Sequence, residues 1–373
     1  LAGGRAGLAG GVDVGVVRSD TVAYLGEGAQ VSARRDVDVN ALSRKEIDTF
    51  TGSLGAGLGA VAGSVSVWSI ASDGIVEGRY TFNDNGRNRS ETAIDSGQLS
   101  MALSPMDSGS EADPAGEFVA SLDAYPAGHP AASRMSLAAS RIDSGISPTV
   151  ISGSLAAPAA EAVEGTVAYI GNGATVDAGN DVNVRASERV DFRVVAGSLA
   201  LGVAGVGASV AILNLDGTVE AFIADGTAIR AGPDANDDVL VLADQFSRVD
   251  GLTVGGQGGV AALGAQVLVI NDDSRQRAHI GDEDENFGRA VVSGAGGSVE
   301  VLARADRGYD LLTAQGGIGA AAVGAAVVVG NAGGETRAYV TDARIGDGGS
   351  VGNLEVRAES DVDLPPRAFA VSG

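Results

Sequence analysis

The chain has no cysteine, few aromatic residues and one lysine, Lys45. Without cysteine it cannot form disulfide bonds, thiolate metal sites or a cysteine nucleophile. Phe, Trp and Tyr make up only 4% of its 373 residues. Ordinary globular cores take much of their buried area from large rings. This core must instead be built from Val, Ala, Leu, Ile and the 57 glycines, which suits thin stacked coils better than a compact body.

Positive charge is also scarce. There are 48 Asp and Glu against 25 Lys and Arg, a formal net charge of −23. This excess argues against nucleic-acid binding, which needs basic patches, and against binding to anionic membranes. The apolar runs at 199–213 and 317–330 are shorter than ~18 residues and rich in Gly and Ala, so no membrane span is expected. The chain starts at Leu1 without a signal peptide, and we expect any export signal or anchor to lie outside this segment.

Three kinds of sequence word recur along the chain. An apolar word rich in Gly, Ala and Val occurs at residues 7–17, 55–70, 201–213, 258–271 and 317–331. A second word carries one ring, as in TVAYLGEGAQV (21–31) and TVAYIGNGATV (166–176). A third word alternates apolar and polar residues, at 36–48, 181–191, 238–250, 298–310 and 353–363. A repeat architecture is therefore indicated.

The rings of the second word give the period. Tyr169, Phe222, His279 and Tyr339 follow one another at intervals of 53, 57 and 60 residues. Tyr24 precedes Tyr169 by 145 residues. With a period of about 55–60, roughly 85–90 extra residues separate these two tyrosines.

Alternation with period two, as in DVNVRA and SVEVLA, predicts half-buried strands. The Gly/Ala/Val words are predicted to be strands, because each interior helical Gly would cost ~1 kcal/mol. We expect these strands to be buried on both faces or to face another coil. The sequence thus predicts an all-β parallel β-helix (β-solenoid), right-handed by default. We expect two or three coils per repeat, a rod of order 50–70 Å, and unpaired strand edges at both ends.

An insertion is predicted between two solenoid regions, giving solenoid at 1–75, insertion at 76–164 and solenoid at 165–373. The insertion holds six of the nine prolines and all three methionines. Pro114, Pro130 and Pro158 each open a stretch with helix-start signals. We expect a mixed helix–loop excursion that either covers a coil face or binds a ligand.

Candidate catalytic residues are few, and the sequence predicts no catalytic site, cofactor site or metal site. His129 lies in a predicted loop, while His279 takes the place of Tyr or Phe in its repeat and is expected to serve as a flat ring. No serine sits in a G-x-S-x-G elbow. Gly319 and Ala322 fit a loose G-x-G-x-x-A pattern, but inside a β-repeat this indicates packing rather than nucleotide binding.

Two acidic turns are the candidates for Ca²⁺. The first turn contains Asp234, Asn236 and Asp238. The second contains Asp282, Asp284 and Asn286. Alternate oxygen ligands can wrap this ion. Neither turn has the Gly and bidentate Glu of an EF-hand, so solvated acidic turns are the stronger interpretation.

Acid pairs raise the possibility of carbohydrate chemistry, because clustered carboxylates can act as acid and base on a glycosidic bond. The pairs are Asp237–Asp238 and Asp272–Asp273. The words G-H-G and R-I-K, which accompany the acids of polygalacturonases, are both missing. A non-enzymatic role is therefore predicted.

The words GVGASVAIL, TVEAFI, DGTAI and DVNVRASERVDFRVVAGSLALG resemble the long repeats of giant bacterial surface proteins, such as leukotoxin-type filamentous adhesins and autotransporter-like passengers. The resemblance covers residues 1–75 and 165–373 and is strongest at 166–215. It implies secretion, a β-solenoid and a role in adhesion or in extending a tip outward. It implies no catalytic residues.

Three functions stay open on the sequence. The first is an extracellular structural or adhesive solenoid whose partners are neighbouring repeats, further copies of itself, surface glycans or a surface protein. The second is a carbohydrate-binding or carbohydrate-cleaving solenoid with its site beside the insertion. The third is a self-assembling sheath or surface-layer subunit.

Overall fold

The structure is a computed structural model that describes residues 2–71, 165–281, 288–347, 349 and 351–373. These residues form strands and turns and no helix, and thus no helix that could cross a membrane. The strands are β1 (Ala2–Arg18), β2 (Thr21–Leu25), β3 (Gln30–Ala33), β4 (Val37–Ala71), β5 (Thr166–Ile170), β6 (Thr175–Ala178), β7 (Val182–Asp216), β8 (Thr218–Ile223), β9 (Ala228–Arg230), β10 (Val239–Gly258), β11 (Ala261–Asp272), β12 (Arg275–Ile280), β13 (Ala290–Ile318), β14 (Ala321–Ala332), β15 (Glu335–Val340), β16 (Ala343–Ile345), β17 (Val351–Asp363) and β18 (Pro366–Ser372). The predicted helices of the insertion and His129 lie outside the described residues.

The fold is a parallel β-solenoid, as the sequence predicts. Strands that are one repeat apart pair in parallel, in one large sheet and in a second, five-stranded sheet of order β15-β12-β8-β5-β2. The pairing joins corresponding words of the repeat. Val37, Val182, Val239, Val299 and Leu354 form one such row across five strands.

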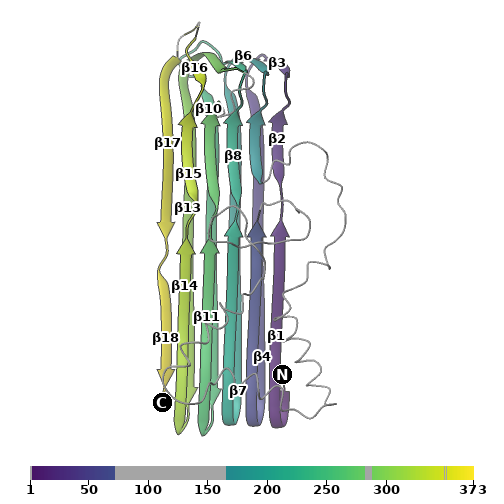
Figure 1. The fold of residues 1–373 in the computed structure, drawn as a ribbon, viewed down its shortest axis with the longest axis vertical. Coiled ribbons are helices and arrows are strands. Elements are labelled where there is room, and N and C mark those ends of the chain that lie inside the picture. Colours follow the sequence, from purple (N-terminus) through teal and green to yellow (C-terminus); the bar gives the residue numbers. More distant parts are fainter. Residues whose placement is uncertain (1, 72–164, 282–287, 348, 350) are drawn as a thin grey trace.

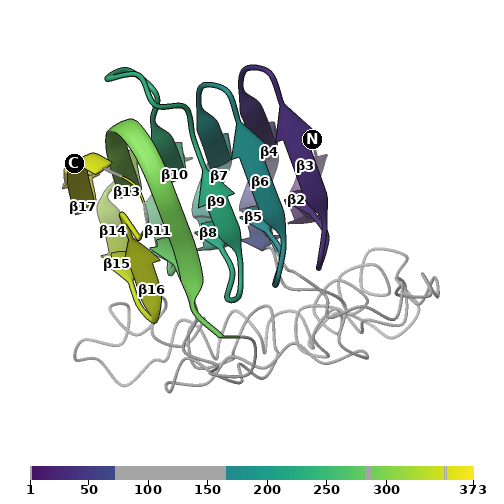
Figure 2. The ribbon, with the colours of Figure 1, turned by 90° about the horizontal axis from the view of Figure 1, so that it is seen from above.

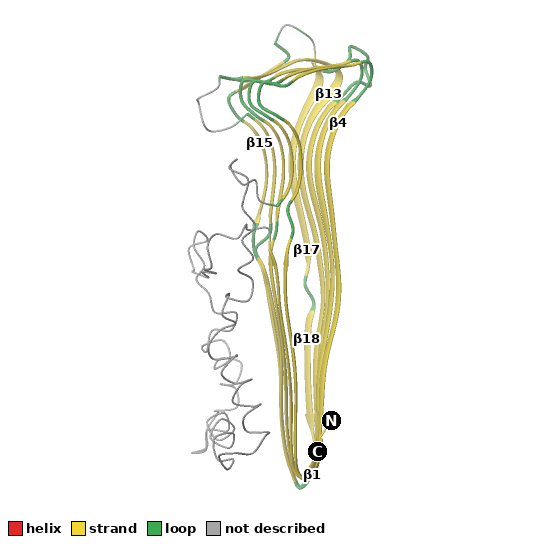
Figure 3. Cartoon of the chain, turned by 90° about the vertical axis from the view of Figure 1, so that its right-hand side faces the viewer, coloured by secondary structure: helices red, strands yellow, loops and turns green. Residues whose placement is uncertain are grey.

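Each coil is long and flat (Figures 1 and 3). In one coil, β10 runs from the wide end to the narrow end, and the chain turns at residues 259–260 and returns as β11 and β12. It then crosses the wide end and enters β13, whose first residues pair with β9 and β16. We call the side that leads to the narrow end the outgoing side and the other the returning side. In β4 and β7 one continuous 35-residue strand supplies both sides.

The prediction of two or three coils per repeat is wrong, because one repeat makes a single coil. The alternating word and the Gly/Ala/Val word form one strand with no turn between them. All residues of one repeat are therefore needed to complete a single coil. The 20 residues of β10 span ~66 Å along the strand. Five stacked coils, by contrast, are only ~19 Å deep between the first and last strands. The expected long rod is therefore a blade, seen along its length in Figure 2.

The core changes in composition from the wide end to the narrow end. At the wide end it consists of Val, Ala and Ile from three walls, including Val184, Ile223 and Ile229, which are fully buried. Midway it contains larger side chains such as Phe192 and Leu268. At the narrow end only alanines such as Ala60 and Ala200 remain. The two sides therefore converge as the side chains between them shrink.

Glycine makes this convergence possible. A Cβ on Gly55 would lie 2.6 Å from the carbonyl oxygen of Val61 on the opposite side of the same coil. A Cβ on Gly205 would lie 2.9 Å from the carbonyl oxygen of Ala200. The Gly/Ala words are strands, as predicted, but they are not buried on both faces. Outward side chains such as Leu263 and Leu201 are 37% and 45% exposed.

The two end coils of the described structure have unpaired strand edges, as expected. At one end β1 and β2 pair on one side only, with β4 and β5, and at the other β14 and β15 pair only with β11 and β12. The excursion after residue 71 starts at a defined point of a coil. Ala71 pairs with Asp216, and Thr166 pairs with Val219, so residues 72–165 stand where that neighbouring coil has two residues.

Close approach between coils should make Gly259 intolerant of any side chain. A Cβ there would lie 2.1 Å from the carbonyl oxygen of Gly202 in the preceding coil, while a Cβ on Gly316 meets only one atom, at 3.9 Å. We predict that Gly259→Ala lowers the free energy of unfolding by about 1–3 kcal/mol, whereas Gly316→Ala changes it by about 0.5 kcal/mol or less. Urea denaturation of both variants tests this. Equal effects would contradict the single-coil register at the narrow end.

Candidate functional site: a buried polar ladder and an aromatic stack

The first predicted Ca²⁺ turn is used to join coils. The Asp238 carboxylate accepts hydrogen bonds from the Ser298 backbone N–H (2.6 Å) and hydroxyl (3.0 Å) of the next coil. The Asp238 N–H donates to the Asp181 carboxylate of the preceding coil at 2.9 Å. Asp237 accepts from the Asp234 N–H at 2.7 Å. These carboxylates cap loops, and in the described part of the chain no three His, Asp or Glu residues gather as metal ligands would.

The second predicted Ca²⁺ turn, with Asp282, Asp284 and Asn286, lies outside the described residues. The same holds for His129 and for the whole of 76–164. The Ca²⁺ alternative for this turn and the expected role of the insertion therefore remain predictions.

The acid pair Asp272–Asp273 is split by the alternation of the strand. Asp272 is fully buried and accepts hydrogen bonds from the Tyr309 hydroxyl and from the Ser274 N–H, the latter at 2.9 Å. Asp273 is partly exposed. Burial and the neighbouring Asp272 carboxylate both raise the pKa of the Tyr309 phenol above its ordinary value. The Asp272 hydrogen bond to Tyr309 therefore joins the returning side of one coil to the outgoing side of the next.

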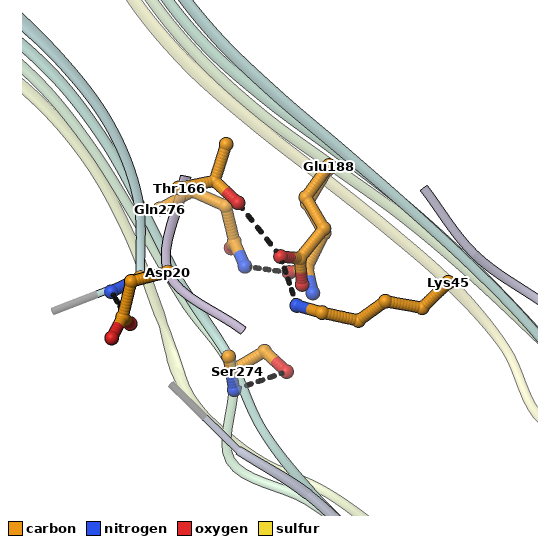
Figure 4. A network of polar contacts seen from close by, with 9 residues as sticks. Asp20, Lys45, Thr166, Glu188, Ser274 and Gln276 are labelled. Atoms are coloured by element: carbon orange, nitrogen blue, oxygen red, sulfur yellow. Dashed lines mark hydrogen bonds and ion pairs between the residues drawn. The ribbon is translucent and has the colours of Figure 1, made fainter. Parts of the chain in front are cut away.

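A ladder of buried polar side chains runs through the coils between the outgoing side and the sheet of β5, β8 and β12 (Figure 4). The Lys45 ammonium lies 2.5 Å from the Glu188 carboxylate, and their side chains are 5% and 1% exposed. The Thr166 hydroxyl donates to the same Glu188 oxygen at 2.8 Å. These contacts join Lys45, Thr166 and Glu188, and Lys45 and Glu188 are 143 residues apart in the sequence.

The ladder continues in the following coils with uncharged amides. Gln276 donates to Gln245 and accepts from Thr336 at 2.9 Å. Arg307, 3% exposed, donates to the Gln276 side-chain oxygen at 3.0 Å and to the Ser274 carbonyl at 3.1 Å. Most of these buried donors therefore meet an acceptor in the same or a neighbouring coil, as low-polarity surroundings favour. Arg307 Nε and Ser247 Oγ are buried without a hydrogen-bond partner among the described residues.

The cavity beside this ladder is too small for a ligand. It is lined by Glu188, Gln245, Ser247 and Ser274 among others, and the centre of a water molecule has about 10 Å³ available in it. Such a space holds about one water molecule. Small-molecule sites measure roughly 300–1,000 Å³. The ladder is thus a closed structural network rather than an active site.

A second buried amide ladder lies nearer the narrow end. Gln266 donates to Gln315 at 2.8 Å, and Gln315 donates to Gln257. Glycines opposite make room for these side chains: a Cβ on Gly255 would lie 1.8 Å from the Gln266 side-chain nitrogen. Where the two sides converge, a glycine on one side therefore leaves the space that a glutamine side chain from the other side fills.

The predicted role of His279 as a flat ring is confirmed. Tyr24, Tyr169, Phe222, His279 and Tyr339 form a continuous stack with ring centroids 4.8–5.1 Å apart and planes within 7°. The His279 ring is fixed by contacts at both nitrogens, Nδ1 to the Gly281 carbonyl oxygen (2.7 Å) and Nε2 to the Glu220 carboxylate (3.5 Å). Neighbouring rings cover each other's faces within the stack.

Gly319 also behaves as the sequence indicates. It lies in the turn at the narrow end, between β13 and β14, where a Cβ would lie 2.3 Å from the carbonyl oxygen of Gly259 in the adjacent coil. Close packing of coils explains the glycine, and it opens no helix.

The polar ladder was not predicted from the sequence, although a signal for it exists. In DVNVRASERVD the inward positions hold Val182, Val184, Ala186, Glu188 and Val190 in turn. A charged residue in an inward series marks a buried polar site. The partner Lys45 could not be assigned, because alternation fixes the side of a strand and not which residues meet across the coil.

Comparison of the chain with protein-family models, with curated proteins and with solved structures found no match. The resemblance to giant bacterial surface repeats therefore rests on the sequence words alone.

The Lys45–Glu188 ion pair gives a direct test of the ladder. We predict that Lys45→Met lowers the free energy of unfolding by about 3–5 kcal/mol, because it leaves a buried carboxylate without its counter-charge. The double variant Lys45→Met/Glu188→Gln should recover at least half of that loss, because no charge is then left and the Thr166 hydrogen bond is kept. Urea denaturation measures both. A single variant within about 0.5 kcal/mol of the parent would show that the pair is not buried.

Tyr309 gives a test by pH. Its folded-state pKa is raised, so the neutral phenol is the form that the fold retains. Stability from this group is present below the unfolded-state pKa of about 10 and falls above it, because only the unfolded chain then releases the proton. We predict that Tyr309→Phe costs about 1–3 kcal/mol at neutral pH, since Asp272 loses a donor, and a smaller amount at about pH 10.5. An unchanged cost at the two pH values, measured by urea denaturation, would contradict this.

Proposed function

We propose that the chain is a structural or adhesive segment of a large extracellular bacterial surface or filament protein and carries out no catalysis. The observation that supports this most directly is the use of buried polar groups. The Lys45–Glu188 pair, the glutamine ladders and the caps at Asp238 all join one coil to the next. An active site would instead leave such groups converging on a space that a substrate can enter.

The blade is short along the solenoid axis and long along its strands, and this shape favours some structural roles over others. One coil of 57 residues, the separation of Asn214 and Asn271, adds only ~4.8 Å along the solenoid axis. A stalk that projects a tip outward gains little reach per residue from this geometry. The same coil presents two broad faces, each ~66 Å long on the scale of β10. The geometry therefore favours a wall-forming or sheath-like role over a slender spacer.

A carbohydrate-active solenoid has less support. Sugars bind aromatic residues through free ring faces, and here the faces of Tyr169, Phe222 and His279 are covered by neighbouring rings. Tyr24 at the end of the stack is 59% exposed. Of the two acid pairs, Asp272 is enclosed in the wall and Asp237 and Asp238 cap a loop.

Surface display is tested by labelling. Antibodies raised against the purified chain are expected to bind intact cells of the organism that produces it, and external protease should remove the signal without lysis. Labelling that appears only after lysis would overturn the proposal. In parallel, polyuronate and neutral polysaccharides incubated with the chain are expected to release no new reducing ends. Release of reducing ends would replace the proposed role by the enzymatic alternative.

A further inference from the structure

In four coils the half of the blade towards the narrow end carries no charge. The four stretches that pass around the narrow end, 49–71, 194–215, 251–271 and 311–334, contain no Asp, Glu, Lys, Arg or His. Four uncharged stretches of more than 20 residues are unexpected in a chain with a net charge of −23. Packing inside the coil explains only their inward residues. The outward residues of the same stretches need a separate explanation.

On the outer face of the outgoing side, charge stops at one row. Asp48, Arg193, Asp250 and Asp310 form the last charged row across β4, β7, β10 and β13. The next outward row towards the narrow end is Phe50, Val195, Leu252 and Leu312. Beyond it lie only Gly, Ala, Val, Leu and Ile in these four strands, and several are exposed: Phe50 76%, Leu199 39%, Leu201 45%, Val254 38% and Ile318 76%. We call this surface the apolar patch.

The apolar patch is large enough to supply most of a stable interface. Its four strands at ~4.8 Å and about nine residues at ~3.3 Å give roughly 570 Å². The largest apolar patch on a typical monomer is about 300–600 Å², and a standard interface buries about 800 Å² per partner. Because the patch is a flat sheet face, it suits face-to-face packing with another sheet at ~10 Å.

We propose that the apolar patch is the interface with a second copy of this chain, related by a two-fold axis that runs parallel to the strands between β7 and β10. This axis places β7 over the second copy's β10 and β4 over its β13, and each row of residues then faces the same row. The interface is isologous, so every contact occurs twice.

The order of side-chain sizes along the rows fits this axis. In successive rows, β7 carries Gly197, Leu199 and Leu201, while β10 carries Val254, Gly256 and Gly258 at the same heights. In these three rows the proposed axis brings each large side chain of β7 and β10 over a glycine of the other copy. On the flanking strands Leu54 of β4 lies over Gly316 of β13, and Ala56 lies over Ile318. In the first row of the patch large side chains would meet instead, with Val195 over Leu252. Ridges and grooves of one face therefore match those of a copy of itself in the three rows nearer the narrow end.

Charges beside the patch fit the same axis at its centre. Arg193 would face the second copy's Asp250, and Asp191 would face its Arg248. Within one chain Arg193 and Asp250 already lie 3.7 Å apart, so the two copies would form a four-charge cluster of alternating sign. On the flanks Arg44 would face Asp306, an opposite charge. Like charges would meet at two flank positions, Asp48 over Asp310 and Asp38 over Glu300. The central charges therefore fix register, and the apolar patch supplies affinity.

Sedimentation of the full 373-residue chain tests the proposal. We expect a dimer, twice 36.9 kDa, that forms as the concentration rises from about 1 to about 100 µM. Leu199→Arg should raise the dissociation constant at least about 100-fold, because it places an unpaired charge in the apolar patch. Ser187→Arg adds the same charge on the same strand and face but in the charged half, where the second copy's Asp244 would face it. That control should dimerise at least as well as the parent.

Cross-linking tests the axis itself, and the absence of cysteine makes it unambiguous. Val254→Cys lies beside the proposed axis and should cross-link to its own copy with a short bismaleimide, whereas Tyr24→Cys on the other face should not. This variant also serves if Leu199→Arg fails to fold, as judged by its circular dichroism and urea midpoint.

Several results would overturn the proposal. A chain that stays monomeric at about 100 µM would do so, as would a dimer that persists in Leu199→Arg. Open-ended polymers that are insensitive to Leu199→Arg would mean that the free strand edges of the end coils associate instead. Flotation of the parent with neutral phosphatidylcholine vesicles, in place of dimerisation, would assign the patch to lipid. None of these outcomes bears on surface display of the chain, so the two proposals fail independently.

Discussion

Strict register between neighbouring coils is the constraint on which the structure depends. Parallel pairing sets each residue ~4.8 Å from its counterpart in the next coil, so a row is a column of like positions. The exceptions are register shifts near the start of β13, at Val292–Gly294 and Ala295–Ser298. Aromatic rings stack in one column from Tyr24 to Tyr339, and amides pair in others. The residue type at a position is therefore constrained by its counterparts in the neighbouring coils as much as by the rest of its surroundings. This explains why residues 145 apart, such as Asp38 and Asn183, still meet at 2.9 Å.

The same constraint governs where polar groups can be buried. A charge inside a narrow solenoid must find its partner in its own coil or in an adjacent one, because nothing else is within reach. Glu188 finds Lys45 on one side and Thr166 across the coil. In the following coils its column continues as Gln245 and Ala305. The polar ladder thus changes along the stack from an ion pair to amides joined by Arg307, and most of its hydrogen bonds are satisfied.

Much of this fold could be predicted because it is local. Alternation in DVNVRA and the recurring ring residue fix strands, inward positions and the columns, and the position of His279 follows from them. The circuit of the coil could not be predicted, because no turn residue marks the difference between one long strand of 35 residues and two shorter ones. The narrow end reverses direction at Gly and Val or Ala, which are also common inside its strands. The Ca²⁺ alternative at Asp234, Asn236 and Asp238 arises for a similar reason, although solvated turns are the stronger interpretation of the sequence. Acidic spacing in a turn looks alike whether the carboxylates face a cation or the N–H groups of the next coil.

One coil per repeat has a consequence for how such a chain can change in length. Duplication or loss of a whole unit leaves all columns intact and alters the stack by a single ~4.8 Å step. A shift by one residue inside a unit would turn its inward side chains outward along both long sides. Recombination that adds or removes whole repeats is therefore tolerated, while small insertions are tolerated only in the turns. The excursion between Ala71 and Thr166 enters at such a turn, and the columns on either side of it, Ile70 with Leu215 and Tyr24 with Tyr169, continue undisturbed.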